Sequence, residues 1–381
     1  MRDLRPLILS NSPRLAFNAA TCLGDQSIQS YVMTSALWSP FHTSVRWIEH
    51  ARICSDQLCN AADELAEYIE RYVRRHDINA IIPGDETATR FVIKHADRFL
   101  DVLTFPTPDS DLFESLCDKW AFAQLADTCG SDHPRSILVQ SIEDASKVDL
   151  GYPMIVKPIR GTSAEGVYVI DSPQTFQTYV ERMAEAEQLP ILAQQYLQGY
   201  DMDLTILADH GEVVAWTIQR RRFEESGVEF IIDDQMLQLG ERIVNATGFH
   251  GIVDFDLRFE TPTNRAYLME ANPRFPGTLR FKLAAGVNFP LMGLGIASGE
   301  RNMIDSFKPV QGACHDHGLA PRAYLRSILG QSPPPGAISR FTSTAHRINR
   351  CDPYPHAALW IGSLFRRGEK VVNHSAGTLP H

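Results

Sequence analysis

The segment 267–274 carries side chains suited to holding a divalent cation. Glu270 and Asn272 lie two residues apart at the end of an apolar, strand-like run, so both side chains should face the same side of a sheet. Asp256 ends an earlier apolar strand and offers a third oxygen. Mg²⁺ prefers such oxygen donors and fills its other positions with water and substrate phosphates. The pattern predicts a Mg²⁺ site, although a turn organised before Pro273 would also explain Glu270 and Asn272.

A lysine and a glycine-bounded loop form a second group, suited to phosphate. Lys157 ends an apolar strand and is followed by Pro158, so a rigid element should fix its ammonium. The loop from Gly161 to Gly166 offers hydroxyls and backbone N–H groups, which a flap over phosphates requires. A plain β-hairpin loop with an edge lysine explains the same residues equally well. Spacing alone does not decide between the two interpretations.

The arginine run that ends at Arg222 follows a predicted strand. A guanidinium there could hold a carboxylate or phosphate through two parallel hydrogen bonds. Arg220 is the first candidate because it lies closest to the strand end, and Arg280 is the second. A solvated charged surface is the competing interpretation.

Two groups of elements must position these residues. The first hundred residues alternate apolar runs, at Pro6–Ser10, near Tyr31 and at Ile78–Ile82, with helical stretches at 56–76 and 86–99. This order predicts a small parallel αβ sheet covered on both faces. No glycine-rich phosphate fingerprint follows its first strand, which argues against dinucleotide binding there.

The pattern changes near residue 107 to a series of strand-like runs separated by Gly or Asn-Pro breaks, which predicts antiparallel sheet. The runs start near residues 153, 192, 203, 213, 251 and 266. We therefore expect a fold of mixed α/β and α+β class. From about residue 305 the sequence defines no clear pattern beyond a proline-rich connector at 331–336.

The whole-chain composition limits the classes of protein. The 381 residues are 44% hydrophobic and 22% charged, which is typical of a globular protein with two or three packed units. The net charge of −10 opposes non-specific binding to nucleic acid, and no run approaches the roughly 20 apolar residues of a membrane helix. We therefore expect a cytoplasmic protein that binds small molecules, with neither nucleic acid nor membrane as partner. A homodimer is compatible with the sequence, which does not define the oligomeric state.

Taken together, the motifs occur in an informative order. Lys119 within Cys-Asp-Lys-Trp precedes Lys157, the Gly-Ser loop and the Glu-x-Asn-Pro-Arg segment that ends at Arg274. In this order the chain resembles the ATP-grasp superfamily. More narrowly, it is similar to the carboxylate–amine ligases related to the large subunit of carbamoyl phosphate synthetase. The resemblance runs from the first strand to about residue 300.

The resemblance implies a role for each matched residue. Lys119 and Lys157 would contact the ATP phosphates and the adenine side, and the loop would close over them with Gly161, Thr162, Ser163 and Gly166. A hinge strand would contact the adenine edge through its backbone at Gln194, Gln195, Tyr196 and Leu197, and Asp201 would receive the ribose hydroxyls. The metal positions fall to Asp256, Glu270 and Asn272, with Mg²⁺ as the ion and Mn²⁺ as an alternative. Arg274 would neutralise the transferring phosphoryl group, and the segment around Arg220 would border the substrate pocket.

Three kinds of departure from the family pattern occur. Gln194 and Gln195 stand where the hinge usually has an acidic residue, Asp201 and Asp256 are shorter than the usual glutamates, and Glu165 places an anion in the loop. Nucleotide preference is therefore left open by the sequence.

The resemblance also implies an architecture and an activity. We expect a pre-ATP-grasp domain at 1–107, an ATP-grasp domain at 108–304 whose antiparallel sheets sandwich the nucleotide, and a C-terminal extension at 305–381. Within the ATP-grasp domain, 108–192 would form the small flap-bearing part and 193–304 the large part. The implied reaction joins a small carboxylic acid to an amine through an acyl phosphate, with release of ADP. A kinase or carboxylase acting on a small molecule, and a non-catalytic nucleotide-binding protein, are the alternatives.

Overall fold

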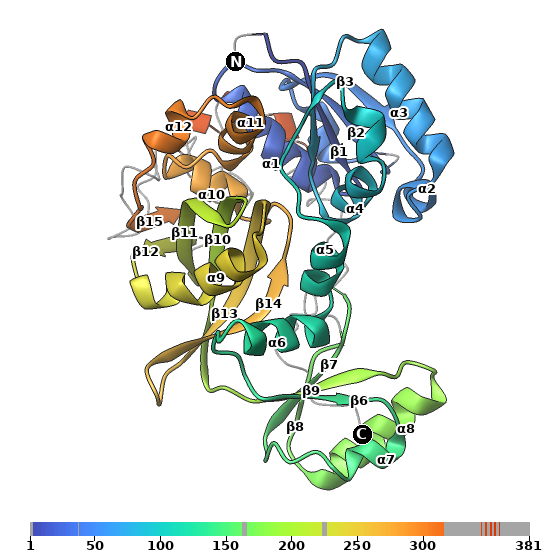
Figure 1. Ribbon diagram of the computed structural model, residues 1–381, viewed down its shortest axis with the longest axis vertical. Helices are drawn as coiled ribbons and strands as arrows, with labels where there is room; N and C mark the ends of the chain where they lie inside the picture. Colours follow the sequence, from blue (N-terminus) through green and yellow to red (C-terminus); the bar gives the residue numbers. More distant parts are fainter. Residues whose placement is uncertain are drawn as a thin grey trace.

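Three sheets organise the chain in the computed structural model (Figure 1). The structure describes residues 3–36, 38–161, 166–222 and 227–315, with the single residues 344, 347, 348, 351, 352, 354, 355 and 358. Within this described part, no helix is both long enough and apolar enough to cross a membrane.

The first sheet is parallel and lies at the N-terminal end of the molecule. Its strand order is β3-β2-β1-β4-β5, and every pairing is parallel. The strands are β1 (Pro6–Ser10), β2 (Ser30–Thr34), β3 (Trp47–Arg52), β4 (Ala80–Pro83) and β5 (Leu103–Thr104). The helices α1 (Pro13–Gly24), α2 (Ser55–Cys59), α3 (Asp63–Arg75) and α4 (Glu86–Lys94) pack around it. Every residue of β1, β2 and β4 is buried, as expected for a parallel sheet covered on both faces.

Local details of this unit differ from the sequence prediction. The single helix expected at 56–76 is broken into α2 and α3, because Ala61 has a φ of +44° that a continuous right-handed helix cannot contain. The helix expected at 86–99 stops at Lys94 and continues as a 3-10 turn, Ala96–Phe99. Strand β3 was not expected, because it is a mostly exposed edge strand without an apolar alternation.

The second sheet is small and antiparallel. Its order is β6-β9-β7-β8, made of β6 (Ser136–Val139), β7 (Met154–Pro158), β8 (Tyr168–Ile170) and β9 (Ile191–Gln195). The helices α7 (Ile142–Ala145) and α8 (Pro173–Glu185) share one hydrophobic core with one face of this sheet. Strand β9 pairs with both β6 and β7, so the small unit continues to Gln195 rather than ending at residue 192.

The third sheet is the largest and is antiparallel throughout. Its order is β14-β13-β10-β11-β12-β15. The strands are β10 (Gly199–Asp209), β11 (Glu212–Arg222), β12 (Gly227–Ile231), β13 (Gly251–Glu260), β14 (Arg265–Asn272) and β15 (Gly312–His315). Strand β15 lies beyond residue 304, so the expected C-terminal extension is not separate from this sheet but supplies its edge.

Alternation along the central strands gives the large sheet one apolar and one polar face. Met202, Leu204 and Ile206 of β10 pack with α5 (Ser110–Cys117), α6 (Lys119–Thr128) and α9 (Asp234–Thr247). The residues between them, Asp203 and Thr205, point to the opposite face. A row of buried polar side chains therefore lies on that face.

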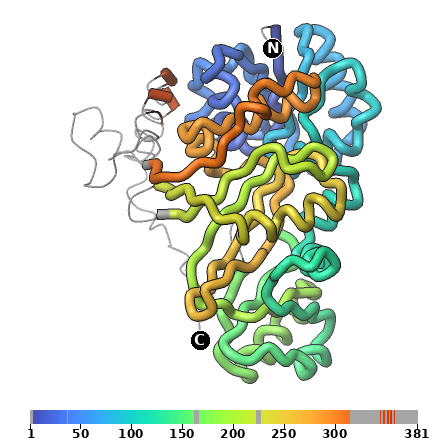
Figure 2. Tube along the Cα trace, turned by 60° about the vertical axis from the view of Figure 1, so that its left-hand side comes forward, coloured from blue at the N-terminus to red at the C-terminus, as the bar shows by residue number. Residues whose placement is uncertain are grey.

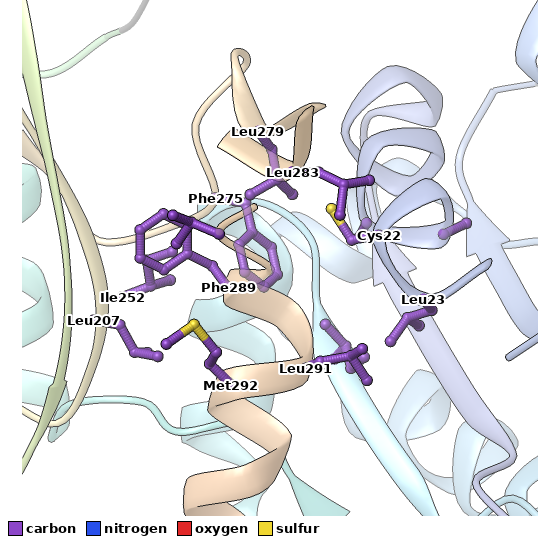
Figure 3. Close-up of a cluster of buried hydrophobic side chains, with 14 of the residues drawn as sticks. Cys22, Leu23, Leu207, Ile252, Phe275, Leu279, Leu283, Phe289, Leu291 and Met292 are labelled. Carbon is purple, nitrogen blue, oxygen red and sulfur yellow. The ribbon is translucent and has the colours of Figure 1, made fainter. Parts of the chain in front are cut away.

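A continuous core joins the large sheet to the N-terminal unit. Helices α10 (Leu279–Ala284) and α11 (Phe289–Ser298) lie against α1, and Figure 2 shows this segment alongside the N-terminal part of the chain. Figure 3 shows Phe275 and Phe289 between Cys22 of α1 and Leu207 of β10. This core fixes the loop that follows β14, where the predicted metal ligands end.

Candidate active site

Strands β13 and β14 bring the predicted metal ligands together. Asp256 lies directly opposite Glu270, and Asp254 directly opposite Asn272. The Asp256 and Glu270 side chains hydrogen-bond to each other. Burial, followed by this hydrogen bond, raises the pKa of Asp256 well above its usual value. Burial opposes ionisation of Glu270 as well, but the bond from Asp256 and the nearby Lys119 and Lys157 lower its pKa. The pKa values of the two carboxyl groups are therefore shifted in opposite directions.

This donor set fits a magnesium ion. A cation between Asp256 and Glu270 would have a carboxyl oxygen from each neighbouring strand, and Asn272 adds an amide oxygen on the same face. The amide is already oriented, because Nδ2 of Asn272 donates to the Asp254 carbonyl oxygen at 3.4 Å and its Oδ1 accepts from Nη2 of Arg274 at 3.0 Å. Arg274 is itself held by the carbonyl oxygen of the buried Phe275, at 3.0 Å from Nη1.

Two lysines face this acidic pair. Lys119 starts helix α6, where its Nζ lies 3.4 Å from Oε2 of Glu270 and donates to the Gly161 carbonyl oxygen at 2.7 Å. It thereby connects the large sheet to the loop after β7. Lys157 of β7 is 5% exposed, and burial, assisted by the charge of Lys119, lowers its pKa to about 8 while Glu270 and Asp256 oppose the shift. The two sheets thus converge on a cluster of two ammonium groups and two carboxyl groups.

The predicted flap begins and ends at glycines that the backbone requires. Gly161 has a φ of +122° and Gly166 a φ of +73°, both in the region that favours glycine. A Cβ at Gly166 would also approach Cγ of Pro158 to 2.9 Å. Thr162 and Ser163, which we expected to contact phosphate, lie outside the described residues.

Arg220 does not join this cluster. Its register partner on β10 is Met202, which belongs to the apolar face. Its guanidinium pairs with Oε2 of Glu229 at 2.7 Å and lies 5.4 Å from the centre of the Tyr200 ring. The next residue, Arg221, points to the polar face, where its Nε is 3.5 Å from Oδ2 of Asp203. The sequence analysis chose Arg220 for its proximity to the strand end, whereas Arg221 is the arginine that lies on the polar face.

A buried polar network under the metal ligands was missed by the sequence analysis. Lys282, fully buried on α10, donates to Oε1 of Gln219 at 3.0 Å and to Oγ1 of Thr278 at 2.9 Å. Gln219 in turn donates from Nε2 to Oδ2 of Asp203 at 2.6 Å. Asp203 lies directly opposite Asp256 on the neighbouring strand. Polar residues alternate with apolar ones along β10 and β11, and this alternation could have predicted that Asp203 and Gln219 share one face. Nothing in the sequence around Lys282 indicates its role.

Comparisons with known proteins match this arrangement. A family model described as ATP-grasp in the biosynthetic pathway with Ter operon matches residues 187–314, and one for the D-ala D-ala ligase C-terminus matches residues 132–231. The carbamoyl phosphate synthase large chain, C-terminal section, of Methanopyrus kandleri is 24% identical over 230 residues, covering 56% of this chain and 42% of that protein. The large chain from Renibacterium salmoninarum is 24% identical over 288 residues, covering 67% of this chain and 26% of that one. The chain thus spans less than half the length of these curated relatives.

Solved structures agree on the fold. The biotin carboxylase domain of Hydrogenobacter thermophilus 2-oxoglutarate carboxylase, solved with MgADP, ADP and bicarbonate, has a TM-score of 0.63 at 16% identity, covering 80% of this chain and 72% of its own. The L-amino acid ligase from Bacillus licheniformis has a TM-score of 0.60 at 16% identity, covering 78% of this chain and 76% of its own. N5-carboxyaminoimidazole synthetase from Staphylococcus aureus has a TM-score of 0.64 at 13% identity, covering 86% of both chains.

The chain is related to the ATP-grasp proteins. The fold class and the family resemblance expected from the sequence are both confirmed.

The strand expected to form the hinge of the ATP-grasp fold is held from both sides. Gln194 of β9 is buried and donates from Nε2 to Oγ of Ser136 at 2.9 Å, and the backbone N–H of Gln195 donates to the Arg135 carbonyl oxygen at 2.9 Å. The half-buried Tyr196 follows, and Leu197 is buried.

Beyond the hinge strand, Arg258 ties this part of the ATP-grasp fold to the large sheet. Its Nε donates to the Leu197 carbonyl oxygen at 3.1 Å, and its Nη1 pairs with Oδ1 of Asp201 at 2.6 Å. Asp201 lies on the same face of β10 as Asp203, with its side chain two-thirds exposed. Arg258 was not predicted from the sequence, because its two partners lie about sixty residues away in the chain.

A second cluster of metal-ligand types lies at the far end of β10 and does not form a coordination site. Asp209, His210 and His250 bring their ligand atoms within 4.8 Å of one another. The two imidazole rings are stacked, with centres 4.0 Å apart and planes at 8°, so one ion cannot lie in both ring planes. Arg301 already pairs with Oδ2 of Asp209 at 3.0 Å. These contacts fasten the β10–β11 turn to β13 and α12 (Asn302–Asp305).

Proposed function

We propose that the protein is an ATP-dependent ligase that joins a small carboxylic acid to an amine and releases ADP and phosphate. The observation that carries this proposal is the cluster of Lys119, Lys157, Asp256 and Glu270 where the two antiparallel sheets meet, with Lys119 paired to Glu270 at 3.4 Å. Such a cluster can hold polyphosphate and a divalent cation together. The relation to carbamoyl phosphate synthase large chains supports a carboxylic acid and an amine as substrates.

In the proposed first step, a carboxylate oxygen of the acid attacks the γ-phosphorus of ATP. A bond from this oxygen to phosphorus forms while the bond to the β-phosphate oxygen breaks, and the electron pair leaves with ADP. In the second step the amine attacks the acyl carbon, the carbon–oxygen bond breaks, and inorganic phosphate departs while the nitrogen loses a proton. Mg²⁺ held by Asp256, Glu270 and Asn272 would neutralise phosphate charge.

The side chains of this chain supply positioning and charge rather than a nucleophile. Lys119 and Lys157 would bind the phosphates, and Arg274 would balance the charge that develops on the transferring group. The loop 161–166 would exclude water, which protects an acyl phosphate from hydrolysis. Adenine would lie along β9, and Asp201 would contact the ribose.

The test is an ADP-release screen with purified protein and MgATP. The acids are the standard amino acids and small mono- and dicarboxylic acids, and the amines are ammonium and amino acids. The product mass is determined for each hit. We expect ADP only when an acid and an amine are both present. Glu270→Gln should lower kcat/KM for MgATP by about 100-fold or more, because it removes one charged ligand without changing shape. Glu212→Gln, at the exposed start of β11 in the same sheet, is the matched control and should keep full activity.

The products discriminate the proposal from its alternatives. AMP in place of ADP would indicate adenylate chemistry. Turnover supported by bicarbonate or a hydroxyl acceptor without an amine would identify a carboxylase or kinase. ATP binding without ADP release under every condition would identify a non-catalytic nucleotide-binding protein.

A further inference from the structure

We infer that Arg221 binds the carboxylate of the acid substrate, and that a buried relay from Lys282 through Gln219 and Asp203 holds its guanidinium in place. This inference rests on the proposed function and names a residue that recognises the substrate at the same site. It also replaces Arg220 with its neighbour as the arginine of the pocket.

The position of Arg221 is set by the large sheet. Strand β10 lies between β11 and β13, and Asp203 at its centre faces both Gln219 and Asp256 across the two ladders. Arg221 approaches Oδ2 of this Asp203 to 3.5 Å with its Nε. The guanidinium is therefore one strand away from the metal ligand Asp256. A carboxylate that attacks the γ-phosphate must lie beside the metal, which is the space that this guanidinium borders.

The relay has only one consistent pattern of hydrogen bonds. A lysine ammonium can only donate, so the atom of Gln219 that faces Lys282 must be its carbonyl oxygen. The amide nitrogen of Gln219 then faces Asp203 and Thr278, at 2.6 and 2.8 Å. This fixes Oδ2 of Asp203 as the acceptor that holds Arg221. Two hydrogen bonds and one ion pair thus connect the buried ammonium of Lys282 to Nε of the half-exposed Arg221.

Among the described residues of this face, Arg221 is an accessible cation that keeps donors for a ligand. Within the described residues, its Nη1 and Nη2 have no hydrogen-bond partner, and 49% of its side chain is exposed. Lys282 is fully buried, and the two Nη atoms of Arg274 are bound to Asn272 and Phe275. The charge of Asp203 raises the pKa of Arg221 although burial opposes it, so the guanidinium stays charged.

A carboxylate is the ligand that suits the remaining donors. The two Nη groups form a planar pair that matches the two oxygens of a carboxylate. The charges of Asp203, Asp256 and Asp254 stabilise the charged form of Arg221, so its guanidinium remains available as a donor.

The experiment compares adjacent arginines on opposite faces of one strand. Arg221→Met, Arg221→Lys and Arg220→Met are assayed for ADP release with MgATP, an amine and the panel of standard amino acids, succinate and malate, and the MgATP dissociation constant is measured by calorimetry. We expect Arg221→Met to raise KM for the preferred acid by about 10- to 100-fold, the usual effect of losing a charged hydrogen-bonded partner. Its affinity for MgATP should change less than about twofold, and Arg220→Met should match the wild type.

A second pair of variants tests the relay. Gln219→Leu should raise KM for the acid while leaving the affinity for MgATP unchanged, and Arg221→Lys should recover part of the loss seen in Arg221→Met, because it restores the charge without the planar fork.

The outcomes separate this inference from the ligase proposal. Acid-dependent ADP release by the wild type, combined with an unchanged KM for the acid in Arg221→Met, would overturn the role of Arg221 alone. Equal effects of Arg220→Met and Arg221→Met would also overturn it. A wild type that binds MgATP but releases no ADP with any acid of the panel would overturn both the ligase proposal and the proposed role of Arg221.

Discussion

Single buried charges give the proposed site its character at the scale of the residue. Lys157 is 5% exposed, and its burial lowers its pKa to about 8. In the free protein, its side chain therefore loses its proton and its charge at a lower pH than an exposed lysine does. Asp256 shows the converse effect, because burial and its hydrogen bond with Glu270 raise its pKa well above the usual value. A bound ligand of opposite charge would favour the charged form of each group.

The affinity for MgATP should therefore fall as the pH rises through about 8. The pKa of Lys157 in the folded protein lies below that of a free lysine, so the cation is present below about pH 8 and is lost above it. Phosphates bind the charged form, which predicts a loss of about tenfold in affinity for each further pH unit. Calorimetric titrations between about pH 7 and pH 9.5 would measure this, with Lys157→Arg as the comparison because a guanidinium stays charged throughout. Parallel pH profiles for the two proteins would contradict the assignment.

At the scale of the element, strand register decides which side chains reach the site. Trp216 and Ile218 of β11 belong to the apolar face, and Arg220 continues their phase. Arg221 shares the phase of Thr217 and Gln219 and so faces the metal ligands. The alternation of β11 was visible in the sequence, and extending it by two residues would have separated the two arginines. A rule based on distance from the strand end could not.

Other parts of the site depended on pairings that no local pattern contains. Glu270, Asn272 and Lys157 could be predicted because each ends an apolar strand beside a proline or near one. Lys282 and Arg258 could not, since their roles arise from contacts with strands about sixty residues away. The break between α2 and α3 was hidden for a related reason, because Ala61 adopts a left-handed conformation without being glycine or asparagine.

The loop after β14 depends on one aromatic side chain. Phe275 is 1% exposed, its ring lies 4.9 Å from that of Phe105, and its carbonyl oxygen holds Arg274. Phe275→Ala should lower the free energy of unfolding by about 3–5 kcal/mol, because it leaves a cavity in the core between the sheets. Without its buried side chain, residue 275 should no longer be fixed in place, and its carbonyl oxygen should no longer orient Arg274. This change should also lower the rate of ADP formation.

The matched control for this prediction is Phe91→Ala. Phe91 is fully buried in the core between α4 and the N-terminal sheet, and it touches none of the proposed ligands. Urea denaturation should give a similar loss of stability for both variants. Assayed under conditions where both are folded, only Phe275→Ala should lose activity, and Phe275→Leu gives a milder version if the alanine variant does not fold. Equal activities of Phe275→Ala and Phe91→Ala would separate the loop from Arg274.

At the scale of the whole molecule, Ile348 and Asp352 contact the N-terminal unit. Asp352, 1% exposed, accepts hydrogen bonds from the side chain of Ser44 and, at 3.3 Å, from the backbone N–H of Val45, and its Oδ2 lies 3.7 Å from Nε of the buried Arg46. Nη2 of Arg46 also donates to the Ile348 carbonyl oxygen at 3.1 Å. Since β15 pairs with β12 at the edge of the large sheet, the described residues after 304 contact both the large sheet and the N-terminal unit.

Removing one partner of this buried pair should destabilise the protein more than removing both. Asp352→Ala leaves Arg46 buried opposite no carboxylate, which predicts a loss of about 3–5 kcal/mol in the free energy of unfolding. The double variant Arg46→Met with Asp352→Leu should recover most of that loss, because two apolar side chains need no charge partner. Urea denaturation of both single variants and the double variant gives the coupling energy. The exposed pair Arg301 and Asp305, 3.9 Å apart, is the control and should contribute less than about 1 kcal/mol. A loss for Asp352→Ala no larger than that for Asp305→Ala would show that the C-terminal segment is not fastened through Arg46.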